Sequence, residues 1–143
     1  MSKTMKESVA DTLEEYSAFL EIDGQTGRAH AYDKAARAVR MASHLPPNPA
    51  RLNGIGDSTR NAVIEVENTG TLDELEELRE EYHWYDEFKD VSHIGPSRAQ
   101  TLYENYSIDS KEKLHMMANA GDLTLLQGVG PKTAQKIEQS LNE

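Results

Sequence analysis

The sequence predicts an all-α fold, a small helical domain in which short glycine hairpins join successive helices. Apolar residues recur at helical spacing along most of the 143 residues, and no segment has a convincing strand pattern. Three short glycine segments each precede a further helical segment. The length fits one compact domain or two small ones. With no cysteine, the chain excludes disulfides, thiolate metal sites and a nucleophilic thiol.

The first two helices follow from apolar spacing and its interruptions. We predict one helix over residues 6–22, ended by Gly24, and a second over residues 28–44. Leu45-Pro46-Pro47 ends the second helix, because a proline ring cannot continue a helix and restricts the residue before it. The apolar face of the first helix consists of Val9, Leu13, Tyr16 and Leu20.

The middle of the chain carries further helix signals. Asn68-Thr69-Gly70 is typical of a helix C-terminus, and Thr71-Leu72-Asp73-Glu74 fits a capping box that opens an acidic helix. We interpret the aromatic residues that follow as packing between helical units rather than as a base-stacking platform. These aromatic residues are Tyr82, Trp84, Tyr85 and Phe88.

The overall charge argues against a simple nucleic-acid function. The formal net charge is -10 and the pI is near 4.9, whereas phosphate binding usually relies on Lys and Arg. The acid is concentrated between Asp73 and Asp90, which we interpret as a solvated helix face. A second hypothesis is a halophilic surface, adapted to a high-salt cytoplasm in which exposed charges are screened.

An internal repeat is the decisive feature. Three segments share the pattern apolar, any residue, Gly, apolar, Gly, then a polar helix start and an apolar residue seven positions after the second glycine. They are Leu52–Gly56 with Val63, Val91–Gly95 with Leu102, and Leu126–Gly130 with Ile137. The second copy has His93 in place of the first glycine, which predicts a strained hairpin because bulky residues resist positive φ. Plain helix-to-helix turns are the alternative.

The repeat predicts helix-hairpin-helix units that bind phosphate. Glycines let the backbone turn tightly, and the helix that follows begins with amide groups that have no partner within the helix. These amides and the positive end of the helix dipole bind a phosphate oxygen without a basic side chain, and such contacts carry no base identity. The apolar residue between the glycines should fill the space between the paired helices; it is Ile55, Ile94 or Val129.

The hairpins and a neighbouring basic helix supply the predicted DNA contacts. They are Gly54, Gly56 and Arg60 in the first copy, Gly95, Ser97 and Arg98 in the second, Gly128, Gly130, Lys132 and Thr133 in the third, and Lys34 on the basic helix. Arg60 stands where the other copies carry Ala99 and Ala134. Either the helix pair is more open in the first copy, or Arg60 points to solvent.

The order of these parts resembles the amino-terminal region of family X DNA polymerases, the DNA polymerase beta group. The segments that carry the resemblance are Arg28–Ala36, Leu52–Gly56, Thr69–Leu75, Ile94–Ser97 and Gly128–Thr133. The resemblance implies a polymerase beta N-terminal-like or SAM-like bundle, with a lyase-like domain at 1–81 and a fingers-like domain at 82–143. It also implies contacts to gapped or nicked DNA from Arg28 and Tyr32, although Tyr32 is equally compatible with the core.

The chemistry of that family does not transfer to this chain. The lysine that forms a Schiff base there matches Ala62, and the phosphate-binding lysine matches Ser58, which we keep as a DNA contact. The palm domain of the family would lie beyond Glu143. Two alternatives stay open: the front region of a family X polymerase with 5′-deoxyribose phosphate lyase function, with Lys34 as a substitute amine, and a protein-interaction adaptor.

We therefore expect sequence-independent binding to gapped, nicked or single-strand/duplex junction DNA in repair or replication, without polymerase or lyase chemistry of its own. The histidine spacing predicts no metal site, and no cofactor is required. The resemblance adds a monovalent cation, K⁺ or Na⁺, at the hairpin carbonyls. No segment is long and apolar enough for a bilayer, so we expect a cytoplasmic protein, with a polymerase or repair protein as a further partner.

Overall fold

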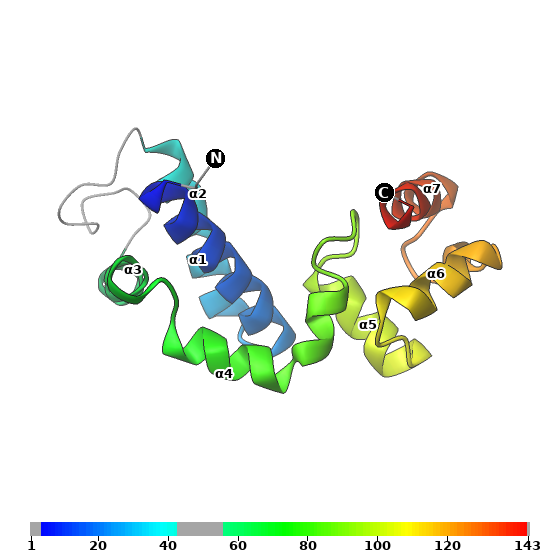
Figure 1. The fold of residues 1–143 in the computed structure, drawn as a ribbon, viewed down its shortest axis with the longest axis horizontal. Helices are drawn as coiled ribbons and strands as arrows, with labels where there is room; N and C mark the ends of the chain where they lie inside the picture. Colours follow the sequence, from blue (N-terminus) through cyan, green and yellow to red (C-terminus); the bar gives the residue numbers. More distant parts are fainter. Residues whose placement is uncertain (1–3, 43–55, 143) are drawn as a thin grey trace. The chain divides into compact units, whose positions relative to one another are not determined.

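The computed structural model describes residues 4–42 and 56–142 of the chain (Figure 1). Every regular element in these ranges is a helix, which confirms the predicted all-α class. The chain forms two compact units, Met1–Tyr82 (unit 1) and His83–Glu143 (unit 2), and each buries its own set of apolar side chains. None of the described helices has both the length and the apolar character needed to cross a membrane.

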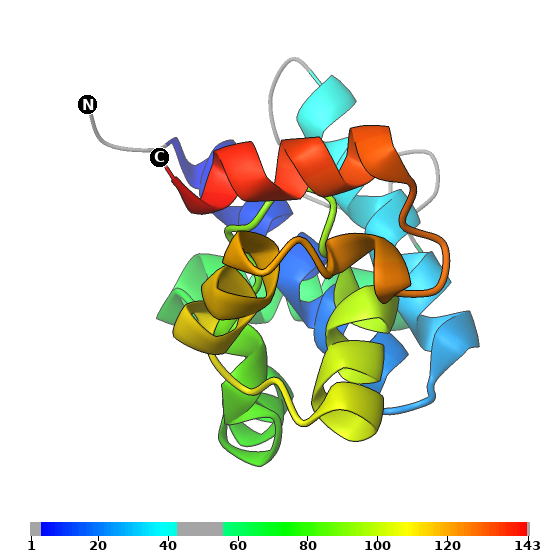
Figure 2. The same ribbon diagram turned by 90° about the vertical axis from the view of Figure 1, so that its right-hand side faces the viewer.

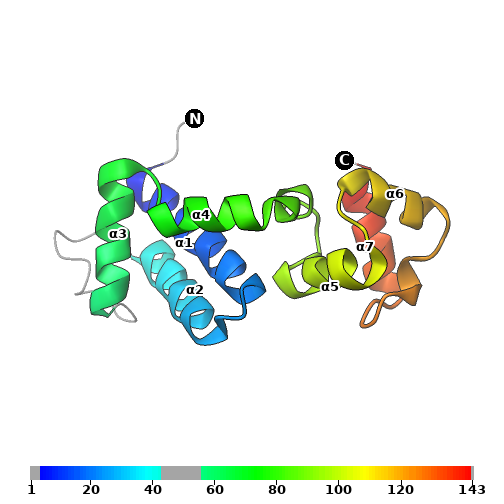
Figure 3. The same cartoon turned by 90° about the horizontal axis from the view of Figure 1, so that it is seen from below.

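Unit 1 is built on the antiparallel helices α1 (Met5–Ile22) and α2 (Thr26–Met41), which lie side by side (Figures 1 and 3). Thr4 caps α1 by accepting a hydrogen bond from the Glu7 amide at 3.1 Å. Ser17 Oγ donates to the Ala29 carbonyl oxygen at 2.6 Å and so joins the two helices inside the core. The largest fully buried side chains of this pair are Val9, Leu13, Phe19, Leu20 and Val39.

Helix α2 ends earlier than the sequence predicts. It stops at Met41, and Ala42 is extended with φ -72° and ψ 142°, whereas the predicted helix continued to His44. Lys6 Nζ, from α1, donates to the carbonyl oxygens of Arg40 at 3.3 Å and Ala42 at 2.9 Å. A long-range contact therefore satisfies carbonyls at the end of α2, and local periodicity does not reveal it. The predicted proline stop at 45–47 lies outside the described residues.

Helices α3 (Asp57–Thr69) and α4 (Asp73–Glu81) complete unit 1. Gly70 ends α3 in the left-handed region with φ +83°, and its N–H donates to the Val66 carbonyl oxygen at 2.8 Å, as the glycine signal predicts. Helix α4 buries Leu75 and Leu78 and exposes most of its carboxylates. The acidic segment thus forms the solvated helix face that we expected.

The predicted capping box at the start of α4 is wrong in its details. The residue that precedes the helix is Leu72, and it makes no side-chain cap. Thr71 Oγ1 instead donates to Glu76 Oε1 at 2.7 Å. The Asp73 amide donates to Glu65 Oε2 at 2.7 Å, so a side chain of the preceding helix takes the place of a local cap.

Unit 2 contains two copies of one arrangement, and its helices run from yellow-green to red in Figure 2. Its elements are η2 (His83–Glu87), α5 (Pro96–Tyr106), α6 (Lys111–Asn119), η3 (Leu123–Leu125) and α7 (Pro131–Leu141). In both copies a short 3₁₀ helix, η2 or η3, precedes a hairpin, and an 11-residue α-helix with proline in its first turn follows it. The core contains Phe88, Leu102, Leu114 and Ile137.

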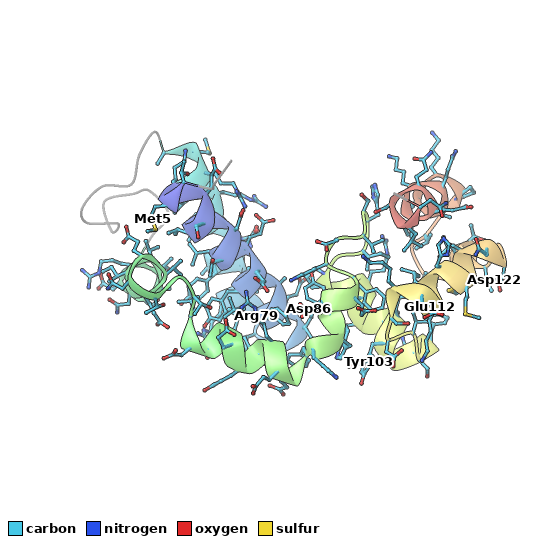
Figure 4. All side chains as sticks on the ribbon, in the orientation of Figure 1. Met5, Arg79, Asp86, Tyr103, Glu112 and Asp122 are labelled. Atoms are coloured by element: carbon cyan, nitrogen blue, oxygen red, sulfur yellow. The ribbon has the colours of Figure 1, made fainter. Side chains whose placement is uncertain are left out.

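The aromatic residues at the start of unit 2 pack into its core, as predicted. Trp84 and Tyr85 are almost completely buried, and Phe88 is 0% exposed. The Trp84 ring stacks on Tyr103 of α5 with a centroid distance of 4.5 Å and an interplanar angle of 4°. Tyr103 is labelled in Figure 4. These rings therefore join η2 to α5 through packing.

Candidate nucleic-acid interface

The two hairpins of unit 2 have the same backbone geometry. The Ile94 amide donates to the Val91 carbonyl oxygen at 3.2 Å, and the Val129 amide donates to the Leu126 carbonyl oxygen at 3.1 Å. The glycine that precedes each helix is extended: φ and ψ are -86° and -178° in the second hairpin, and -88° and 179° in the third. The sequence repeat is therefore also a conformational repeat.

The position before the central apolar residue is left-handed in both hairpins. Gly128 has φ +79°, and His93 has φ +67° at the matching position. Among the described residues, only His93 and Ser107 combine positive φ with a side chain. The strain that the sequence predicts at His93 is therefore present, because a residue with a Cβ is disfavoured in this region.

A buried apolar side chain anchors each of these two hairpins to the core of unit 2. Ile94 and Val129, between the turn positions, are 4% and 5% exposed, which confirms the expected apolar plugs of these two copies. The framing residues Leu102 and Ile137 are fully buried on the helices that follow. Because the apolar residue of each hairpin is held in the core, its exposed backbone has a defined position. Ile55 of the first copy lies outside the described residues.

Each helix after these hairpins begins with amides that have no acceptor within the helix. The first intrahelical bonds run from the Ala99 amide to the Gly95 carbonyl and from the Ala134 amide to the Gly130 carbonyl, both at 2.9 Å. Proline at the first helical position has no N–H, and the amides of the next two residues come before the first intrahelical bond, so they have no acceptor within the helix. These residues are Ser97 and Arg98 in α5, and Lys132 and Thr133 in α7.

The first hairpin is described only at its end, because Gly54 lies outside the described residues. Gly56 is extended, with φ -98° and ψ -173°, and its carbonyl accepts from the Arg60 amide at 2.9 Å, so it matches the other two copies. Asp57 follows where they carry proline, and Ser58 is exposed in the next position. The exposed Asp57 carboxylate places negative charge at the helix start, where the other copies have none.

The first copy also differs from the other two in carrying Arg60 where they have alanine. Its side chain is half-buried, and its Nε is buried without a hydrogen-bond partner in the part of the chain that the structure describes. An unpaired buried donor is unfavourable by about 1 to 3 kcal/mol.

Helix α2 places its three predicted contacts in different environments. Lys34 is exposed. Arg28 is also exposed, but its guanidinium donates to Glu74 Oε2 at 2.8 Å and to Tyr16 Oη at 2.7 Å. Tyr32 is only 7% exposed and its ring packs on Tyr16 with centroids 4.6 Å apart, which is the core placement that the sequence left open.

The acidic residues are unevenly distributed along the sequence, and the glycine repeats fall between them. The three longest stretches without Asp or Glu are residues 34–56, 91–103 and 123–137, and each contains one copy of the glycine repeat. Asp122, labelled in Figure 4, borders the third stretch. The net charge hides this pattern, whereas the positions of the acidic residues reveal it without a structure. Lys132 and Lys136 are exposed on α7 within the third stretch.

The side chain of Arg98 bends back onto the hairpins. Its Nη1 donates to the His93 carbonyl oxygen at 2.5 Å, and its Nη2 donates to the Gly128 carbonyl oxygen at 3.3 Å. A monovalent cation beside these two carbonyls would face the charge of the guanidinium, so they do not fit the expected ion. Among the described residues, no group of three or more His, Asp or Glu side chains could hold a metal ion.

Comparison with known proteins agrees with this geometry for most of unit 2. Residues 85–143 match the family model described as SAM-like Helix-hairpin-helix tandem. The matched range contains the second and third hairpins and supports nucleic-acid binding in general terms, whereas the first hairpin lies outside it. No curated protein matches the chain.

Proposed function

We propose that this chain binds DNA without reading its base sequence, through contacts between hairpin amides and backbone phosphates. The observation that carries the proposal is the repeated geometry of Gly56, Gly95 and Gly130. All three are exposed, extended and followed by a helix whose first amides have no acceptor within that helix. Such amides and the helix dipole bind phosphate oxygens and leave base edges unread.

The acidic composition is compatible with this proposal because the charge is unevenly placed. Each hairpin lies in a stretch without carboxylates, and the third also carries Lys132 in the first turn of α7. In the second and third copies, a phosphate that approaches the start of the helix meets amide donors rather than Asp or Glu side chains, whereas Asp57 stands there in the first copy. Because few basic side chains take part, the affinity should depend less steeply on salt than that of a basic DNA-binding protein.

The preferred DNA is gapped, nicked or a single-strand/duplex junction in repair or replication. The support for this choice is the resemblance to the amino-terminal region of family X DNA polymerases in the order and spacing of the hairpins. The chain contributes no polymerase or lyase chemistry of its own under this proposal. Ala62, at the position of the Schiff-base lysine, is buried and offers no amine.

A substitution at Gly130 tests the proposal without disturbing the fold. A Cβ at this position meets nothing within 4 Å, and the backbone conformation is open to any residue. In Gly130→Asp, the new carboxylate accepts hydrogen bonds from the first amides of α7, which stabilises the helix and occupies the phosphate site. We expect at least a tenfold loss of affinity for gapped DNA, with an unchanged or higher unfolding temperature.

The matched control adds the same charge elsewhere on the same helix. Gln139→Glu lies in the last turns of α7 and is exposed, so it leaves the first amides unblocked. The measurement is a fluorescence anisotropy titration with gapped, nicked and intact duplexes of several sequences. If Gly130→Asp binds gapped DNA as tightly as the control, or if the wild-type chain binds none of these DNAs, the proposed function is wrong.

A further inference from the structure

We propose that Arg98 is a positioning residue that fixes the separation of the two hairpins of unit 2, so that both bind phosphates of one DNA at the same time. Its guanidinium joins the His93 carbonyl of its own hairpin to the Gly128 carbonyl of the next, over 2.5 Å and 3.3 Å. This inference rests on the proposed DNA binding. It assigns the Arg98 side chain to the hairpin carbonyls, whereas the sequence suggested a contact between that side chain and phosphate.

The two acceptors occupy the same place in the two hairpins. His93 and Gly128 are the left-handed residues, with φ +67° and +79°, and each precedes the buried apolar plug. A guanidinium presents its donors in a rigid planar fork, so one side chain can hold two carbonyls in a fixed arrangement. The contact to Gly128 spans 30 residues of sequence and therefore acts between the motifs rather than within one.

A second hydrogen bond joins the same two motifs on another side. The Ser92 amide, in the second hairpin, donates to Ser140 Oγ near the end of α7 at 2.9 Å. The second hairpin is thus tied to the third motif both at Gly128 and at Ser140. Two separate ties restrict how one hairpin moves relative to the other, whereas a single bond leaves a pivot.

The fixed separation matters because binding through two hairpins is bivalent. When two sites are held at the spacing of two phosphates, the second contact forms at a high effective concentration. If the sites move relative to each other, part of the binding free energy is spent on ordering them. The Arg98 backbone amide remains a candidate phosphate donor, while its side chain holds the hairpin carbonyls.

The test compares Arg98→Met and Arg98→Lys in the full chain, each alone and combined with Gly130→Asp. We expect Arg98→Met to weaken binding to gapped DNA about tenfold, corresponding to roughly 1.4 kcal/mol. Arg98→Lys should restore little, because an ammonium lacks the fork that spans two carbonyls. In the Gly130→Asp background only one hairpin of unit 2 binds, so Arg98→Met should then change the affinity less than twofold.

The salt dependence separates a positioning role from a direct contact. Loss of a side-chain phosphate contact lowers the slope of log K against log[salt] by about 0.9, whereas loss of a positioning residue leaves the slope unchanged. Three outcomes would overturn the positioning role of Arg98 and leave the proposed DNA binding intact. They are a reduced slope, full rescue of binding by Arg98→Lys, and equal losses of affinity in both backgrounds. Failure of the wild-type chain to bind DNA would overturn the proposed function as well. If Arg98→Met unfolds, Arg98→Gln, which retains amide donors, replaces it in each comparison.

Discussion

In the second hairpin, His93 adopts a left-handed backbone conformation that favours glycine. The third hairpin has Gly128 at the matching position, with nearly the same φ. We expect His93→Gly to stabilise the chain by up to about 1 kcal/mol, because removal of the Cβ relieves more strain than the added freedom of the unfolded chain costs. Urea unfolding of the full chain, followed by circular dichroism, measures the change.

The converse change at Gly128 serves as the control for His93. A side chain there would be strained at φ +79°, and its Cβ would lie 3.6 Å from Arg98 Nη2. Gly128→Ala should therefore destabilise the chain by about 1 kcal/mol. If His93→Gly and Gly128→Ala changed the free energy of unfolding by the same amount and in the same direction, the left-handed conformation would not explain either effect.

Asp23 and Tyr82 form a hydrogen bond that makes the folding stability of unit 1 depend on pH in both acidic and alkaline solution. Tyr82 Oη donates to Asp23 Oδ1 at 2.6 Å. This bond, with a second one from Gln25, lowers the pKa of the Asp23 carboxyl below its usual 3.8. The same bond raises the pKa of the Tyr82 hydroxyl far above its usual 10.0.

The stability that this bond contributes is lost in two pH ranges. It is complete above the usual pKa of an aspartate and declines as the pH falls through the lowered pKa of Asp23. It is also complete below the usual pKa of a tyrosine and declines as the pH rises above 10.0. Asp23→Asn and Tyr82→Phe should therefore destabilise at pH 7, and their difference from the wild type should narrow as the pH falls below 3.8, as urea titrations can measure.

At the scale of the element, the first residue of a helix decides how well its hairpin accepts phosphate. Helix α3 begins with Asp57, whereas α5 and α7 begin with Pro96 and Pro131. We expect Asp57→Asn to strengthen binding to gapped DNA two- to fivefold, because the exposed carboxylate no longer repels phosphate at the helix start. Pro131→Asp is the reverse test and should weaken binding. If Asp57→Asn changes nothing, the first hairpin does not contact DNA.

Local sequence patterns located most of the α-helices and both hairpins of unit 2, but they did not single out α6, and long-range contacts were not predictable from them. The spacing of the glycines located both hairpins of unit 2 and the strained position of His93. The end of α2 depends on Lys6, and the start of α4 depends on Glu65, each on another helix. The side chain of Arg98 was also beyond prediction, because Gly128 lies 30 residues away. Such partners become visible only when the chain is folded.

At the scale of the whole molecule, the acidic surface sets how the chain responds to ionic strength. The formal net charge of -10 includes 25 acidic residues, most of them in the Met1–Tyr82 unit. We expect the unfolding temperature to rise with KCl, because screening reduces repulsion among these carboxylates. A differential scanning fluorimetry series from low to molar KCl measures this, and choline chloride controls for specific binding of K⁺. An unfolding temperature indifferent to salt would argue against a surface adapted to high salt.

The carboxylate-free stretches around the hairpins also bear on how the molecule meets DNA. Under the proposed function, the acidic residues repel DNA while the hairpins of unit 2 bind it, so the orientation of the chain affects each encounter before any contact forms. Such a protein should coat intact chromosomes poorly and spend little time sliding, since sliding relies on diffuse positive charge. Moderate salt then has two opposing effects on association. It weakens the attraction between Lys132 and phosphate, and it also screens the repulsion between the carboxylates and phosphate. Association would consequently be fastest at an intermediate ionic strength rather than in dilute buffer.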